Sequence, residues 1–167
     1  MKAFLCKNAP WLTLLPVLAL MGMIFVFSSQ PAELSNQTSG GIVQLILDLF
    51  FPGFEKYDPA RQAQITETVV LFVRKGAHFT EYALLGLALL VHIMVWRKRR
   101  RISRPCPLAL GIGALYAASD ELHQVFVPGR SGELSDVLLD CAGVAAGIVL
   151  LWLLMRKRKS RGAPDPQ

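Results

Sequence analysis

Two histidines of this chain are spaced from carboxylates as on one face of a helix. His78 precedes Glu81 by three residues, and Asp120 precedes His123 by three. Such residues are neighbours on a helix surface, where a carboxylate can orient an imidazole ring and raise its basicity. Facing each other, the two pairs would make a proton-transfer centre. They could also bind a metal ion, because helix-borne histidine and carboxylate ligands converge in some bundle cores. The spacing is not a named metal signature, so the cofactor is left open.

A second kind of chemistry is indicated by Arg130. It lies in the turn Pro128-Gly129-Arg130-Ser131-Gly132. Glycines let backbone amides approach a ligand, and a guanidinium can hold phosphate or carboxylate by two hydrogen bonds. With Arg74 and Lys75, Arg130 would form an anion site for a lipid phosphate or a precursor pyrophosphate. The alternative is that these residues bind lipid headgroups without specificity.

The candidate residues fall into two groups. The candidate catalytic residues are His78, Glu81, Asp120, His123, Asp136 and Asp140. The candidate ligand-binding residues are Arg74, Lys75, Tyr82, Glu121, Gln124 and Arg130. The alternative is purely structural: polar side chains between helices also hydrogen-bond the helices together, at about 0.6 kcal/mol on average per interaction.

Composition indicates the class of protein that must position these residues. The chain has 167 residues, of which 53% are hydrophobic, and its mean hydropathy is +0.40. That is too apolar for an ordinary soluble domain, so we expect a multi-pass membrane protein. The three cysteines show no paired spacing, which argues against a disulfide framework or a zinc motif. The basic residues cluster at segment ends without aromatic interleaving, so the net charge of +6 does not indicate nucleic-acid binding.

The apolar segments predict an all-α membrane protein with four transmembrane helices in a single domain, 1–167. The predicted spans are about 10–27, 77–96, 107–127 and 135–155. A cleaved signal peptide is the alternative for the first segment. It is less favoured, because Phe27, Ser28 and Ser29 do not form a small-residue cleavage site.

The connection between the first two spans has two predicted parts. Residues 28–41 are rich in Ser, Asn, Gln, Thr and Gly, which is typical of a loop. Residues 42–51 are apolar but too few to cross a bilayer. Gln44 and Asp48, at i and i+4, form one polar stripe there. We therefore expect a short helix lying in the outer membrane interface.

A further helix is predicted to begin at Pro59. Asp58 is a favourable N-cap and proline is favoured at the first helical position. Whether this helix breaks at Gly76 is left open. His92, alone among apolar residues, is expected to be a packed or interfacial histidine and is given no functional role.

The basic residues predict the orientation in the membrane. Of the 18 lysines and arginines, two lie in the N-terminal segment, six in the connection 97–104 and five in the tail 156–167. The positive-inside rule then places both termini and that connection in the cytoplasm. The end of the tail, 162–167, is expected to be disordered.

This topology places four polar clusters at one depth. They come from the outer ends of spans one and three and the outer starts of spans two and four, which predicts one outward-facing pocket with Arg130 at its rim. The six candidate catalytic residues would line it. Four acids against two histidines leave excess negative charge. An acid must be protonated, Arg130 or Lys75 must reach in, or a cation must bind.

The polar clusters together resemble a known family. The blocks are Phe27-Ser28-Ser29-Gln30-Pro31, Arg74-Lys75-x-Ala77-His78-x-x-Glu81-Tyr82-x-x-Leu85-Gly86, Ser119-Asp120-Glu121-x-His123-Gln124-x-Phe126-x-Pro128-Gly129-Arg130 and Asp136-x-x-x-Asp140-x-x-Gly143. In this order they resemble the VanZ-like family of bacterial integral membrane proteins. The resemblance implies a protein of the bacterial cytoplasmic membrane and cell envelope. The name-giving member of the family confers low-level resistance to teicoplanin, but the resemblance implies no established reaction.

Two functions of different classes are therefore predicted. In the first, the protein binds membrane lipids and an anionic envelope lipid or lipid-linked cell-wall precursor without catalysis, and so alters access of a glycopeptide to its target. In the second, it is a membrane-embedded enzyme that modifies such a ligand, with His78 or His123 as acid or base and Arg130 holding the anion. A transporter is a distant third, because the chain shows no internal repeat or broken helix.

Overall fold

The protein is all-helical over the residues that the computed structural model describes, 2–100 and 102–161, with side chains described for 11–97 and 102–156. The elements are α1 (Lys2–Ser28), α2 (Ala32–Phe50), the short 3-10 helix η1 (Phe54–Lys56), α3 (Pro59–Arg100), α4 (Pro105–Gln124) and α5 (Leu134–Arg161). The predicted all-α class is confirmed. The tail expected to be disordered, 162–167, and Arg101 of the basic connection lie outside the described residues.

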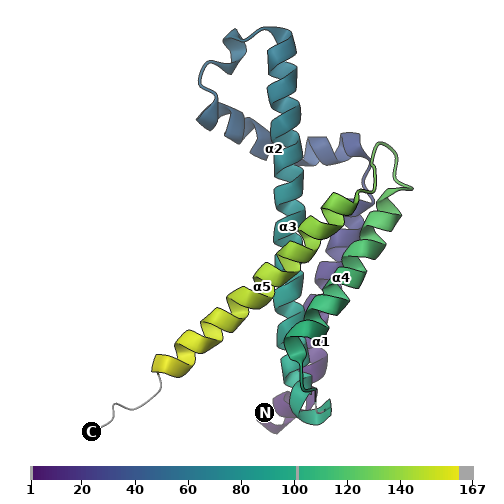
Figure 1. The fold of residues 1–167 in the computed structure, drawn as a ribbon, viewed down its shortest axis with the longest axis vertical. Helices are drawn as coiled ribbons and strands as arrows, with labels where there is room; N and C mark the ends of the chain where they lie inside the picture. The colour runs from purple at the N-terminus through teal and green to yellow at the C-terminus, as the bar shows by residue number, and fades with distance from the viewer. Residues whose placement is uncertain (1, 101, 162–167) are drawn as a thin grey trace.

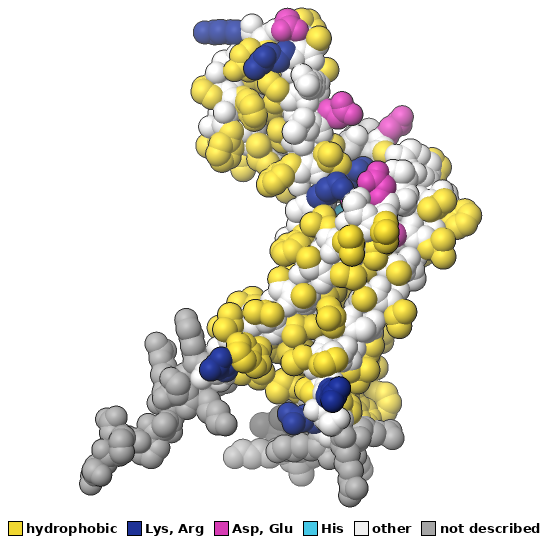
Figure 2. All heavy atoms as spheres, in the orientation of Figure 1, with side chains coloured by type: hydrophobic (Ala, Val, Ile, Leu, Met, Phe, Trp, Pro, Cys, Tyr) yellow, Lys and Arg dark blue, Asp and Glu magenta, His cyan; other side chains and the backbone are white. Residues whose placement is uncertain are grey.

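Three of these helices are long and apolar enough to cross a membrane: α1 over Trp11–Ser28, α3 over Pro59–Arg97 and α5 over Leu134–Arg156. The chain is therefore a multi-pass membrane protein. Helix α4 is not one of these three, and its last two turns carry Asp120 and Glu121. On the face drawn in Figure 2, charged side chains gather near the two ends of the helical bundle, and hydrophobic surface separates them.

Helix α3 is the axis of the molecule (Figure 1). It begins as predicted: the Asp58 carboxylate accepts a hydrogen bond from the backbone N–H of Arg61 at 3.0 Å, and Pro59 is the first helical residue. The helix continues through Gly76 without a break. Its 42 residues rise about 63 Å, roughly twice the thickness of a bilayer's hydrocarbon core. The predicted span 77–96 is thus only the second half of a longer helix.

The prediction of a loop over residues 28–41 holds for 29–31 and was wrong from Ala32 onward. Helix α2 begins at Ala32, so the expected short helix 42–51 is only its second half. Val43 and Leu47, one turn apart, are buried against Val69 of α3, and this contact stabilises the helix despite its polar first half. The predicted polar stripe is present, since Gln44 Nε2 donates to Asp48 Oδ1 at 2.9 Å.

The bundle is built around the contact between α3 and α5, which is the most extensive in the molecule. Glycines let the two backbones meet. A Cβ added to Gly86 would lie 2.3 Å from the carbonyl oxygen of Val144, and one added to Gly147 would lie 1.9 Å from that of Ala83. Gly143 and Gly147 make the small-xxx-small spacing that is common where membrane helices cross closely. Helices α1 and α4 pack on the other sides of α3.

One end of the bundle carries the first turns of α1, the connection between α3 and α4, and the last turns of α5 (Figure 1). His92 lies toward this end of α3. Its Nδ1 is 3.0 Å from the Thr13 hydroxyl of α1, and its ring packs on Trp96. The expectation that His92 is a packed histidine is confirmed.

Candidate functional site

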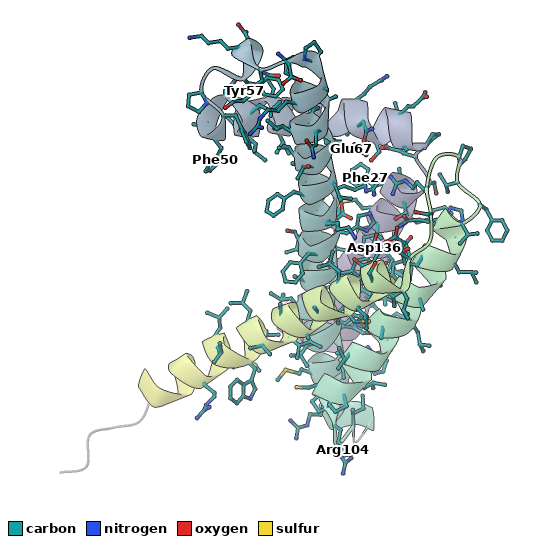
Figure 3. The ribbon with its side chains drawn as sticks, turned by 45° about the horizontal axis from the view of Figure 1, so that its top comes forward. Phe27, Phe50, Tyr57, Glu67, Arg104 and Asp136 are labelled. Carbon is teal, nitrogen blue, oxygen red and sulfur yellow. The ribbon has the colours of Figure 1, made fainter. Side chains whose placement is uncertain are left out.

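The polar residues meet at the opposite end of the bundle, where α1 and α4 end and α5 begins beside the middle of α3. Figure 3 shows Phe27 and Asp136 at the ends of α1 and α5 in this region. A tight turn leads from α4 toward α5. The Arg130 N–H donates to the Val127 carbonyl at 3.1 Å, and Gly129 has a φ of 73°. Proline followed by a left-handed glycine is the pattern of a type II turn.

Asp120 lies inside this end of the bundle and is 3% exposed. Its Oδ2 accepts hydrogen bonds from the Ser28 hydroxyl at 2.7 Å and from Gln124 Nε2 at 3.2 Å. Its Oδ1 is buried and has no hydrogen-bond partner among the described residues. The carboxylate is therefore held on one side only, and its other oxygen is available to a further group.

His78 of α3 and Asp140 of α5 lie next to Asp120. The distance from His78 Nδ1 to Asp140 Oδ1 is 3.9 Å. One ligand atom from each of His78, Asp120 and Asp140 can be chosen so that all three lie within 4.8 Å of one another. Three helices thus bring one imidazole and two carboxylates together. Among the described residues, these three are the ones that could hold a metal ion.

The two pairs predicted along single helices do not form hydrogen bonds in the described part of the chain. The Nε2 of His123 is 3.1 Å from the Ser29 hydroxyl, and its ring packs on Phe25 with centroids 4.9 Å apart. His78 faces Asp140 rather than hydrogen-bonding Glu81. The contacts of both histidines are thus made to residues outside their own helices, Asp140 and Ser29.

The Arg130 side chain caps the C-terminal end of α1. Its Nε donates to the Gln30 carbonyl at 2.9 Å and its Nη2 to the Phe27 carbonyl at 3.1 Å, while Nη1 reaches Gln124 Oε1 at 3.4 Å. The last carbonyls of a helix lack partners within the helix, and a cation there also complements the helix dipole. Burial, followed by repulsion from Arg74, lowers the pKa of the Arg130 guanidinium from its usual value. An arginine still stays charged near neutral pH.

A pocket of about 260 Å³ opens between α2, α3 and the end of α1. Its lining is Phe27, Gln30, Ser35, Thr38, Ser39, Ile42, Val73, Arg74, Ala77, His78, Glu81 and Arg130. Arg74 and Glu81 make no hydrogen bond or ion pair with another residue in the described ranges. The pocket therefore offers an unpaired guanidinium and an unpaired carboxylate within a mainly apolar wall.

Among the other candidate residues, Lys75, Asp136 and Glu121 have structural partners, whereas the buried Tyr82 hydroxyl has no hydrogen-bond partner among the described residues. Lys75 forms an ion pair with Asp136 at the start of α5. Glu121 is buried and accepts the backbone N–H of Glu133 at 3.1 Å. Tyr82 is completely buried, with its ring centroid 6.2 Å from that of Tyr116.

The VanZ/LLP1 family profile matches residues 13–155. The chain belongs to the VanZ/LLP1 family. The match extends from the first apolar helix into α5, so it includes every residue of the site. No curated protein and no solved structure matches the chain.

In this VanZ/LLP1 protein the predicted site residues are divided between a buried cluster, the pocket beside it, and positions outside both. His78, Asp120 and Asp140 form the buried cluster, and His78 also lines the pocket with Arg74, Glu81 and Arg130. Gln124 joins the cluster through Asp120. His123, Tyr82 and Glu121 do not line the pocket.

Six polar residues at the site were not among the candidates. Ser28 and Ser29 contact Asp120 and His123, and Ser35, Thr38 and Ser39 line the pocket from α2. Gln30 also lines the pocket, and its carbonyl accepts a hydrogen bond from Arg130. Ser28 and Ser29 belong to the first sequence block of the family resemblance, and that block could have identified them as site residues. The three from α2 are spaced three and four apart, as on one helix face, but the segment was expected to be a loop.

Proposed function

We propose that this protein crosses the bacterial cytoplasmic membrane four times as a single domain, 1–167, with α1, the second half of α3, α4 and α5 as the spans. Including α4 is supported by its packing on both α3 and α5 within the apolar bundle. Helix α2 lies in the outer interface. Its exposed residues Ile42, Leu45 and Leu49 support this position, because they offer an apolar face without a protein partner in the described chain.

We also propose that both termini and the 97–104 connection are cytoplasmic, so that the pocket opens on the outer side. The support is the concentration of lysine and arginine in those three segments.

Cysteine labelling tests this orientation with two exposed serines. In a variant lacking Cys6, Cys106 and Cys141, we expect a membrane-impermeant maleimide to modify Ser131→Cys in intact cells. Ser103→Cys should react only after the cells are permeabilised. The reverse pattern would place the pocket on the cytoplasmic side and would contradict the proposal.

For the function itself, we propose that the pocket binds the anionic group of an envelope lipid or lipid-linked cell-wall precursor. The observation that carries this proposal is that Arg74 and Arg130 line one pocket. Because the two cations repel each other, an anion between them is favoured. The Ser35 hydroxyl of α2 adds a hydrogen-bond donor, whereas the hydroxyls of Thr38 and Ser39 donate to backbone carbonyls of their own helix. At about 260 Å³ the pocket is below the ~300–1,000 Å³ typical of drug-sized ligands, so it suits a headgroup rather than a whole precursor.

Binding is tested with the purified protein in detergent, using a polyprenyl phosphate, phosphatidylglycerol and neutral phosphatidylcholine as probes. We expect the anionic lipids to bind and Arg74→Gln to weaken that binding about 10–100-fold, since a hydrogen bond to a charged group contributes about 1.5–3 kcal/mol. Arg61→Gln is the matched control, because Arg61 is exposed and packs on Tyr57 away from the pocket. Equal affinity of wild type and Arg74→Gln, or of anionic and neutral lipids, would contradict the proposal.

A second candidate function is catalysis on the same ligand. It is favoured by one observation: His78 and Glu81 line the pocket beside the two arginines. One of these groups would transfer a proton to or from a bound substrate. Lipid and precursor analysis of cells with and without the protein separates the two functions. Identical profiles, together with binding of a lipid by the purified protein, would exclude the enzyme.

We connect this site to the phenotype for which the family is named. A protein that occupies or alters an envelope precursor would change access of a glycopeptide to its target. The measurement is teicoplanin susceptibility of cells that express wild type or Arg74→Gln. Equal susceptibility of cells with and without the wild-type protein would remove this link and leave lipid binding to be judged on its own.

A further inference from the structure

The buried cluster of His78, Asp120 and Asp140 has more negative charge than its surroundings neutralise. Asp140 has no exposed surface, and neither of its carboxylate oxygens has a hydrogen-bond partner among the described residues. The same holds for Asp120 Oδ1 and His78 Nδ1. Lys75 is already paired with Asp136, and Arg130 donates to Gln30, Phe27 and Gln124. Arg74 lines the neighbouring pocket and forms no ion pair with the cluster in the described residues. Buried polar atoms are rarely left without partners, because each costs about 1–3 kcal/mol and a charged group costs more.

Asp120 is also oriented by residues outside the cluster. Ser28 and Gln124 both donate to its Oδ2, which leaves Oδ1 as its available atom. In metal sites of proteins, a ligating carboxylate is commonly oriented by hydrogen bonds from residues that do not touch the metal. The hydrogen bonds from Ser28 and Gln124 to one oxygen of Asp120 are of this kind. The three unpartnered groups come from α3, α4 and α5, so their convergence depends on the fold rather than on one helix.

From these observations we propose that His78, Asp120 and Asp140 bind a divalent first-row transition-metal ion of the Zn²⁺ class. Two positive charges would neutralise the two carboxylates. Zn²⁺ lies about 2.0–2.2 Å from histidine nitrogen and carboxylate oxygen, so two ligands of one tetrahedral ion are roughly 3.3–3.6 Å apart. The His78–Asp140 distance of 3.9 Å and the 4.8 Å limit on the full set are somewhat longer, so the side chains must draw together by roughly 1 Å to bind the ion.

The ligand types favour this class of ion over Ca²⁺ or Mg²⁺. Ca²⁺ takes six to eight oxygen ligands and Mg²⁺ a near-ideal octahedron of oxygens, whereas imidazole suits zinc, iron, copper and nickel. The three protein ligands leave one position of a tetrahedral site open. His78 also lines the pocket, so the ion lies beside the proposed anion site without depending on it.

The test measures metal content and affinity of the full-length protein in detergent. After treatment with chelator and dialysis against Zn²⁺, we expect about one Zn²⁺ per wild-type chain. Asp140→Asn and His78→Gln should each weaken binding at least tenfold, because each removes one of three ligands. Co²⁺ provides a second readout: its visible absorption should appear with wild type and be lost in both variants.

The matched control is Asp48→Asn, which removes an exposed carboxylate that is bonded to Gln44 far from the cluster. It should bind Zn²⁺ like wild type. Each variant is first checked for monodisperse elution, and His78→Gln serves if Asp140→Asn does not fold. Absence of Zn²⁺ binding by wild type, equal binding by wild type and either folded ligand variant, or preference for Ca²⁺ or Mg²⁺ would each overturn the proposal. Arg74→Gln should keep Zn²⁺ binding, so failure of the anion site and failure of the metal site are distinguishable.

Discussion

The contact between α3 and α5 makes a sharp prediction for Gly147. In Gly147→Ala the new Cβ would lie 1.9 Å from the Ala83 carbonyl oxygen, 2.8 Å from its carbonyl carbon and 3.0 Å from the Leu87 nitrogen. All three atoms are backbone, so no side-chain rotation can relieve the overlap. The two helices must separate.

The size of the effect follows from this geometry. Restoring an ordinary contact of about 3.4 Å requires α3 and α5 to move apart by roughly 1.5 Å, and a gap of even 0.5–1 Å forfeits a quarter to a half of the dispersion energy between facing atoms. Overpacked positions typically lose 1–3 kcal/mol, and we expect a loss near 3 kcal/mol because this is the most extensive helix contact.

The assay is thermal unfolding of the purified protein in detergent, with Gly22→Ala as the matched control. A Cβ at Gly22 meets nothing within 4 Å, so alanine should leave stability unchanged or raise it by up to about 1 kcal/mol through helix propensity. The two substitutions are chemically identical, but only Gly147→Ala should lower the unfolding temperature. Equal unfolding temperatures for the two variants would refute the close approach of α3 and α5.

Three further substitutions test other parts of the structure by the same unfolding assay or by hydrogen exchange. Ser28→Ala removes the 2.7 Å bond to buried Asp120 and should cost about 1.5–3 kcal/mol; no loss would mean that the bond is not formed. Asp58→Ala should cost about 0.5–2 kcal/mol, seen as faster amide exchange in the first turn of α3 only, and Asp58→Ser should restore protection. Gly129→Ala should cost about 1–2 kcal/mol because its φ of 73° is left-handed, whereas Gly129→Asn should cost less.

The parts of the fold that could be predicted from the sequence are those set by local chemistry. Long apolar runs predict helices, and an aspartate followed by proline predicts the start of α3. The first half of α2 could not be predicted in this way, because its Ser, Asn and paired glycines are typical of loops. Its helix depends on Val43 and Leu47 packing against α3, which is a tertiary contact.

For the site, the sequence could predict which residues share a helix face but not which residues they contact. Helical spacing indicates which residues share a face, so His78 and Asp120 could be chosen as polar groups directed inward. Spacing does not indicate what that face meets. Asp140 becomes the neighbour of His78 because Gly143 and Gly147, on the same face of α5, allow the two backbones to approach. The crossing of the helices, rather than the pattern on either one, determines the partners.

The unbroken course of α3 through Gly76 also has a mechanical consequence. One stiff rod carries both α2 and the bundle, so the α3 wall of the pocket, with Arg74 and His78, cannot bend relative to the spans. The opposite wall is α2, which joins the rest of the chain through two short non-α segments, 29–31 and 51–58. A change in the distance between these two walls would therefore require α2 to move at these joints, against its packing of Val43 and Leu47 on Val69. A ligand that drew Ser35 or Ser39 toward Arg74 would shift α2 relative to the spans and leave the spans in place.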